Sequence, residues 1–162
     1  MANKLPLVMY SGRIKQLQSG DTLQVPISSV NVQDWVNGES GSIVIGTPVY
    51  IQAADTVKKA KADALATADC VGIVFDTTIS NGVSGQIAHA PGDVVTATTG
   101  QWDAVAGTTG GLAVNALYFL SAATAGQMTA TAPTTVGQCV TIVGIGISST
   151  ELKLILDLAI ML

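Results

Sequence analysis

Charged residues are scarce in this chain, and one long block has none. Only 11% of the 162 residues are charged, whereas an average soluble domain has about 25%. Residues 104–150 contain no Asp, Glu, Lys, Arg or His, so this block cannot supply acid–base chemistry. Polar residues interrupt it before any apolar run reaches about 18 residues, and a membrane span is not expected. A surface this poor in charge is expected to be covered by its own fold or by neighbouring subunits, which favours an assembly protein.

Basic and aromatic residues are also few, and this argues against nucleic acid as a partner. The formal net charge is -4 and aromatic residues make up 4% of the chain. The one short lysine cluster, Lys58, Lys59 and Lys61, is typical of a solvated face, and the aromatic residues are too few to form stacking platforms.

Cysteine is limited to Cys70 and Cys139, each followed by an apolar run. A buried thiol behaves as a small hydrophobe, so we expect both to be reduced. No His or Cys lies at metal-ligand spacing from them, and we expect neither a metal nor another cofactor. The first residues lack the apolar stretch of a secretory signal, so the product is expected to remain in the cytoplasm until it is assembled.

Residues 1–42 differ from the rest and are interpreted as an extended N-terminal arm or edge hairpin. They contain short alternating pieces and the turn signal Ser19-Gly20-Asp21. An N-terminal strand folded onto the main domain is an equally open interpretation, because terminal segments become ordered only when something holds them. Five apolar residues are the candidates for interface contacts: Leu5, Leu7, Ile14, Leu17 and Trp35. Trp35 would be the anchor, since buried aromatic residues dominate interface energetics, unless it belongs to the core of the main domain.

Residues 43–162 predict a β-rich domain, because short β-prone runs alternate with Gly, Asn, Asp and Pro. The expected strands cover residues 43–45, 48–52, 56–61, 71–76, 85–88, 93–97, 117–121, 127–131, 139–147 and 152–158. The last is the clearest, because leucine recurs at every second position. At most one short helix is expected, at residues 63–69. The predicted fold is mainly β, a compact barrel or sandwich.

No constellation of catalytic residues emerges from the sequence. His89 and Asp93 could orient each other, but a nucleophile such as Cys70 would have to be brought to them, and a surface turn histidine explains the pattern better. Four carboxylates could pair or bind Ca²⁺ but match no loop pattern: Asp55, Asp63, Asp69 and Asp76. The glycines at 110–111 and 144–146 lack the rest of a nucleotide fingerprint. We therefore predict that the protein is not an enzyme.

The order of strand and glycine motifs resembles that of phage proteins. The opening Lys4-Leu5-Pro6-Leu7-Val8 with the stretch from Ile14 to Leu23 is similar to the start of many tailed-bacteriophage virion proteins, among them head decoration and fibre proteins. The later motifs are similar to those of capsid cement proteins: Gly46-Thr47-Pro48-Val49-Tyr50, Val57-Lys58-Lys59-Ala60, Val71-Gly72-Ile73-Val74, Gly92-Asp93-Val94-Val95 and Leu117-Tyr118-Phe119-Leu120-Ser121. The resemblance covers nearly the whole chain.

The resemblance implies a β-tulip-like domain, usually a homotrimer, on the exterior of the virion capsid. Such a domain docks on the expanded icosahedral shell at local threefold positions, contacts the major capsid protein and cements neighbouring capsomers. The alternative is a head-fibre, tail-fibre or spike component that recognises a host glycan, for which Trp102 would be an exposed platform. A hydrolase of the host envelope is a more distant alternative.

Overall fold

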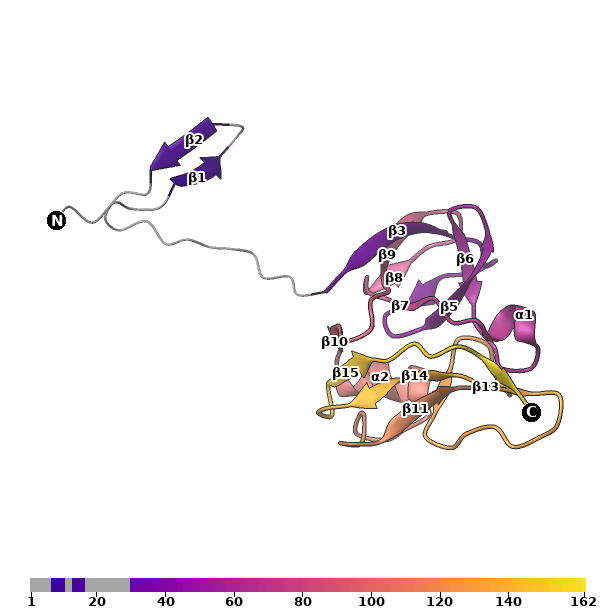
Figure 1. The fold of residues 1–162 in the computed structure, drawn as a ribbon. Helices are drawn as coiled ribbons and strands as arrows, with labels where there is room; N and C mark the ends of the chain where they lie inside the picture. Colours follow the sequence, from indigo (N-terminus) through magenta and orange to yellow (C-terminus); the bar gives the residue numbers. More distant parts are fainter. Residues whose placement is uncertain (1–6, 11–12, 17–29) are drawn as a thin grey trace.

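The computed structural model describes the backbone of residues 7–10 and 13–16 and the whole of residues 30–162. The predicted mainly β fold is confirmed, and it includes a closed barrel. Near the N-terminus, β1 (Leu7–Tyr10) and β2 (Arg13–Gln16) pair antiparallel as a two-stranded sheet of their own. From Val30 onward the chain builds a barrel followed by a second sheet (Figure 1).

The barrel is formed by the first half of the chain. Five strands close it in the order β3-β6-β5-β7-β9: β3 (Val32–Asn37), β6 (Thr56–Lys59), β5 (Pro48–Ala53), β7 (Gly72–Val74) and β9 (Ser84–Ala88). β3 runs parallel to β6, and the other neighbours are antiparallel. A short pair, β4 (Ile43–Val44) with β8 (Thr78–Ile79), accompanies them.

Alternation along the strands fills the barrel with apolar side chains. Each of the five strands contributes one buried residue to a common cluster: Trp35, Val49, Val57, Val74 and Ile87. Successive side chains of a strand point to opposite faces, so one residue per strand is enough to form a layer inside a small barrel. The pair β4 and β8 adds Ile43 and Ile79 to the same cluster.

The predicted boundary of the arm at residue 42 is wrong, because β3 belongs to the barrel. β3 pairs with β9 over five residues, from Val32 opposite Ala88 to Val36 opposite Ser84. Trp35 is only 8% exposed and lies in the barrel cluster. The interpretation of Trp35 as an arm anchor is therefore corrected in favour of the core. Closing the barrel requires this strand, since without it β6 and β9 would present open edges.

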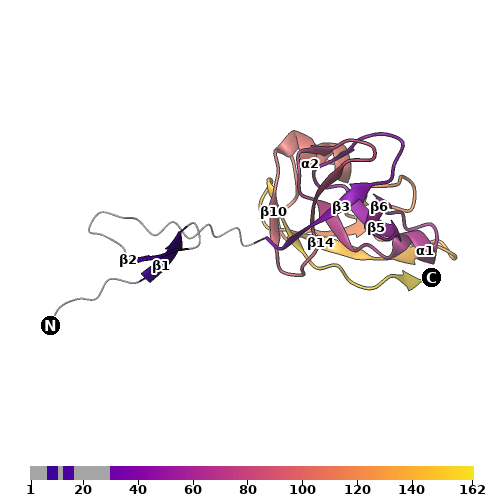
Figure 2. The ribbon, with the colours of Figure 1, turned by 90° about the horizontal axis from the view of Figure 1, so that it is seen from above.

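The second half of the chain forms a five-stranded sheet beside the barrel (Figures 1 and 2). Its order is β10 (Val94–Thr96), β15 (Glu151–Leu154), β14 (Ile142–Gly146), β11 (Leu117–Leu120) and β12 (Met128–Thr129), all antiparallel. A separate pair joins β13 (Cys139–Val140) to β16 (Ile160–Met161). The predicted strand 139–147 is thus divided at Thr141, whose buried hydroxyl donates to the Ala68 carbonyl at 3.0 Å.

Two helices are present in the described residues, where at most one was predicted. α1 (Leu65–Ala68) lies within the expected range 63–69. α2 (Thr99–Ala106) was not predicted, although its start carries a capping box: Thr98 accepts from the Gln101 backbone N–H, and the Gln101 side chain accepts from the Thr98 N–H. It ends at Gly107, whose φ of 62° suits glycine at a helix C-terminus.

Barrel and sheet share one large apolar core. It contains residues from the outside of the barrel and from the sheet and α2, among them Ile73, Trp102 and Leu152. Trp102 is fully buried, and its indole Nε1–H donates to the Thr150 carbonyl at 2.9 Å. Gly46, with a φ of +82°, lies so close that an added Cβ would come within 2.7 Å of the Trp102 ring.

Backbone hydrogen bonds join the two halves along the same seam. The Gly126 N–H donates to the Ala60 carbonyl at 2.7 Å, and the Cys139 N–H donates to the Ala62 carbonyl at 2.8 Å. Together with the shared core, these bonds make barrel and sheet a single body.

The clearest predicted strand, 152–158, ends early. Leu152 and Leu154 are buried as expected, but β15 stops at Leu154. Leu156 adopts a φ of 53°, a left-handed conformation that turns the chain and breaks the alternation of the strand. Leu158 is consequently 80% exposed.

Candidate docking surface

Exposed apolar side chains gather around the last residues of the chain. We call this region the C-terminal apolar edge and define it by Leu65, Val136, Leu158, Ile160, Met161 and Leu162, which are 42–87% exposed. β16 is held by β13, with Met161 opposite Cys139 and Ile160 opposite Val140. Val136 is brought close because the neighbouring Gly137 N–H donates to the Leu162 carbonyl at 3.1 Å.

One side of β16 is open in the described part of the chain. β13 is its one strand partner there. The Leu162 N–H donates to the Gln138 carbonyl at 2.9 Å, so the even-numbered residues direct their backbone groups toward β13. Because backbone groups alternate in direction along a strand, those of Met161 point away from β13. An unpaired strand edge of this kind is a ready site for another strand.

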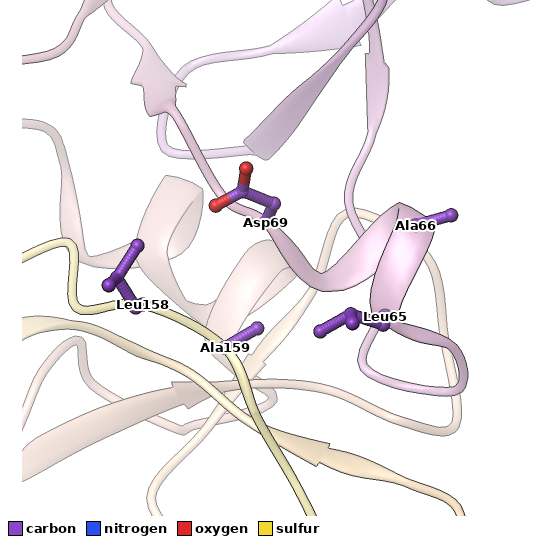
Figure 3. Close-up of a pocket in the computed structure, with 5 residues that line it drawn as sticks. All are labelled: Leu65, Ala66, Asp69, Leu158 and Ala159. Atoms are coloured by element: carbon purple, nitrogen blue, oxygen red, sulfur yellow. The ribbon is translucent and has the colours of Figure 1, made fainter.

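A shallow pocket of about 400 Å³ lies beside this strand (Figure 3). Leu65, Ala66 and Asp69 line it from α1 and the turn after it, and Leu158 and Ala159 line it from the C-terminal segment. Figure 3 shows Leu65 and Ala159 directed toward one another across the pocket. The walls are therefore mainly apolar, with a single carboxylate among them.

Asp69, the carboxylate in the pocket, differs from nearby Asp63 in its ion pairing. Asp63 pairs with Lys61, whose Nζ lies 2.7 Å from Oδ2, and this contact lowers the pKa of Asp63. Asp69 is exposed and has no ion-pair partner within residues 30–162. Asp157, next to Leu158, is also exposed. The pocket therefore lies in acidic surroundings.

The N-terminal segment joins the domain at Asn31, which hydrogen bonds hold in place. The Asn31 backbone N–H donates to Asp93 Oδ2 at 2.6 Å, and its side-chain amide donates to Oδ1 at 3.0 Å. The His89 N–H donates in turn to the Asn31 carbonyl at 3.2 Å. This exit lies at the opposite end of the domain from the C-terminus (Figures 1 and 2).

Of the other predicted interface residues, the structure describes the backbone of Leu7 and Ile14. Leu7 is in β1 and Ile14 is in β2, where Ile14 is opposite Met9. Leu5 and Leu17 lie outside the described residues. Their role in an interface stays a prediction.

His89 and Asp93, a possible pair for which a surface turn histidine is the preferred interpretation, each make other contacts. The Asp93 carboxylate is 6% exposed and binds Asn31, which lies 62 positions away in the sequence. His89 instead packs edge-on against Trp35, with ring centroids 6.0 Å apart and an interplanar angle of 70°. Asp93 therefore binds Asn31, where the N-terminal segment leaves the domain, and His89 packs against Trp35 of the barrel.

Three other residues that the sequence suggested for catalysis or ligand binding, Cys70, Asp76 and Trp102, are buried or hydrogen-bonded within the fold. Burial raises the pKa of the Cys70 thiol to about 12, so it is not an activated nucleophile. Asp76 accepts a hydrogen bond from the Gln86 N–H at 2.8 Å. Trp102 is buried, which corrects the expectation of an exposed glycan platform. Within the described ranges, no group of three or more His, Cys, Asp or Glu could hold a metal ion.

Charge is divided unevenly between the N-terminal segment and the domain. Of the seven basic residues, three lie in residues 1–29: Lys4, Arg13 and Lys15. Of the eleven acidic residues, one lies there and ten lie in residues 30–162. The segment therefore carries a formal charge of +2 and the domain one of -6.

No protein-family model and no curated protein matches the chain. In the portion of the chain that the structure describes, neither helix has the length and hydropathy needed to cross a membrane. The fold establishes the class: a mainly β protein with a closed five-stranded barrel joined to a second sheet.

Sequence reasoning missed the C-terminal apolar edge, although a signal was present. Residues 158–162 are all apolar and follow directly on Asp157. The predicted strand 152–158 places Leu158 on its apolar face. No sequence pattern predicts the contact of Asp93 with Asn31, because the two residues lie 62 positions apart in the chain.

Proposed function

We propose that this protein is a structural virion protein of a tailed bacteriophage, which binds the outer surface of the capsid and stabilises the expanded shell. Its partners would be the major capsid protein and copies of itself, as a homotrimer at local threefold positions. The role requires neither catalysis nor a cofactor.

The observation that carries the proposal is the arrangement of two contact regions on one rigid body. The N-terminal segment leaves at Asn31, held by Asp93, and the C-terminal apolar edge lies at the opposite end. A subunit that contacts two neighbours can fasten a lattice. Many modest contacts repeated over a shell give strong retention through multivalency. The order of motifs that resembles capsid cement proteins supports the same role.

The test is co-sedimentation of the purified protein with expanded shells from which it has been stripped. The expected result is saturation at a fixed ratio of bound copies to major capsid subunits. Absence of binding at any protein concentration would contradict the cement role and favour the alternative, a fibre or spike component. In that alternative Trp102 would stack against a sugar at the surface, but Trp102 is buried.

Deletion of residues 1–25 tests the role of the arm. We expect a folded domain, because the barrel begins at β3, and poor binding to shells. Thermal unfolding of the truncated protein is the control for folding. Binding equal to that of the full chain would refute a role of the arm in docking.

A further inference from the structure

We propose that the C-terminal apolar edge is a binding site for residues 1–6 of a second copy of this chain, with Leu5 in the pocket beside Leu158. This inference deepens the proposed function by naming the self-contact of the assembly. It is tested on the purified protein without shells, so the two proposals can fail separately.

The site offers both parts of a strand-addition interface. On the open side of β16, the backbone groups of Met161 have no strand partner within residues 30–162, and the pocket between Leu65 and Leu158 provides a place for an apolar side chain. When a peptide adds to a sheet edge, main-chain hydrogen bonds give affinity and side-chain pockets give specificity. Exposed apolar side chains that surround an open strand edge mark an interaction site.

The N-terminal segment has the chemistry that this site requires. Leu5 precedes Pro6, and a residue before proline is biased toward the extended conformation of a strand. Lys4 lies next to Leu5 and supplies a positive charge for the acidic surroundings of the pocket, where Asp69 is exposed. The charges of the whole segment and the whole domain, +2 and -6, are complementary.

The position of the arm exit favours a neighbouring copy over the same copy. The start of β3 and the C-terminus lie at opposite ends of the domain (Figures 1 and 2). The bonds from Asn31 to Asp93 fix the chain at the far end. Residues 17–29 span at most about 45 Å when extended, so the contact would be with a directly adjacent copy. A head-to-tail contact of this kind forms a closed ring when the rotation between copies closes, and a homotrimer is such a ring.

The first experiment measures the mass of the full chain in solution as a function of concentration. We expect an oligomer that is lost when residues 1–6 are deleted. Leu158→Glu is expected to weaken association at least about tenfold, because it replaces a leucine that the contact would bury with a charge that would lose its hydration in the apolar pocket. Val83→Glu is the matched control, since Val83 is 52% exposed in the turn before β9 and should leave association unchanged.

The second experiment identifies the contact by cysteine cross-linking. Leu5→Cys and Leu158→Cys are made in separate proteins, which are mixed under mild oxidation; the native cysteines are buried. The expected product is a disulfide-linked pair containing one of each variant, with Leu5→Cys and Val83→Cys as the control mixture. Absence of that product overturns the proposal. So does a double variant, Leu5→Cys with Leu158→Cys, that cross-links only within single chains.

Discussion

Replacement of Trp102 by alanine is expected to destabilise the barrel and the second sheet together. The docking surface depends on this seam, because the barrel half supplies Leu65 and Asp69 and the sheet half supplies Leu158. If the two halves share one core, a cavity in the seam must lower the free energy of unfolding of the whole body.

The structure sets the magnitude of the effect. The Trp102 side chain is 0% exposed, and its ring fills the space against Gly46. Truncation of a buried aromatic residue to alanine costs about 3–5 kcal/mol. For a chain of this length this corresponds to a decrease in Tm of roughly 6–20 °C. Trp102→Phe keeps most of the ring but loses the hydrogen bond to Thr150, so a smaller loss of about 1–2 kcal/mol is expected.

The assay uses the only tryptophan that remains in the variant. The chain has two tryptophans, so in Trp102→Ala the fluorescence reports Trp35 inside the barrel, while circular dichroism reports the whole domain. Urea unfolding followed by both probes should show one shifted transition. A barrel that unfolds with the wild-type midpoint while the dichroism signal shifts would refute the shared core.

Three further predictions concern single side chains. Cys70, whose pKa is raised to about 12 by burial, should not react with a thiol reagent at neutral pH until the protein unfolds; rapid reaction of native protein would contradict its burial. The pKa of Asp103 lies below its ordinary value of 3.8, first because the Gly111 N–H donates to its carboxylate. A folded pKa below the unfolded one stabilises the protein above pH 3.8, and this contribution disappears as the pH falls through the folded pKa. Asp103→Asn should therefore lower Tm at neutral pH and approach the wild type in acid, whereas a pH-independent difference would argue against this carboxylate contact. Leu154→Ala should cost about 2–5 kcal/mol in urea unfolding and Leu158→Ala less than about 0.5, and equal losses would place the end of β15 wrongly.

Local patterns were sufficient to predict the class of the fold and most of its strands. Short β-prone runs between turn residues indicated a barrel or sandwich, and β5 and β11 lie within or close to the predicted ranges. Such patterns are readable because alternation and turn chemistry act between neighbouring residues. The helix α2 was within reach too, since Thr98 and Gln101 have the spacing of a capping box.

Long-range contacts decided what the sequence did not reveal. Trp35 could belong to an arm or to a core, and only the pairing of β3 with β9 placed it inside the barrel. Leu158 continues the leucine alternation in the sequence, yet the left-handed turn at Leu156 leaves it exposed.

The sequence alone therefore determined the fold class, the basic character of the N-terminal segment and the acidic character of the domain. The tertiary structure decided where the arm leaves and which apolar residues remain uncovered. The physical reason is that burial depends on which segments meet in space. A pattern within one segment shows that it has an apolar face, but not which surface covers that face.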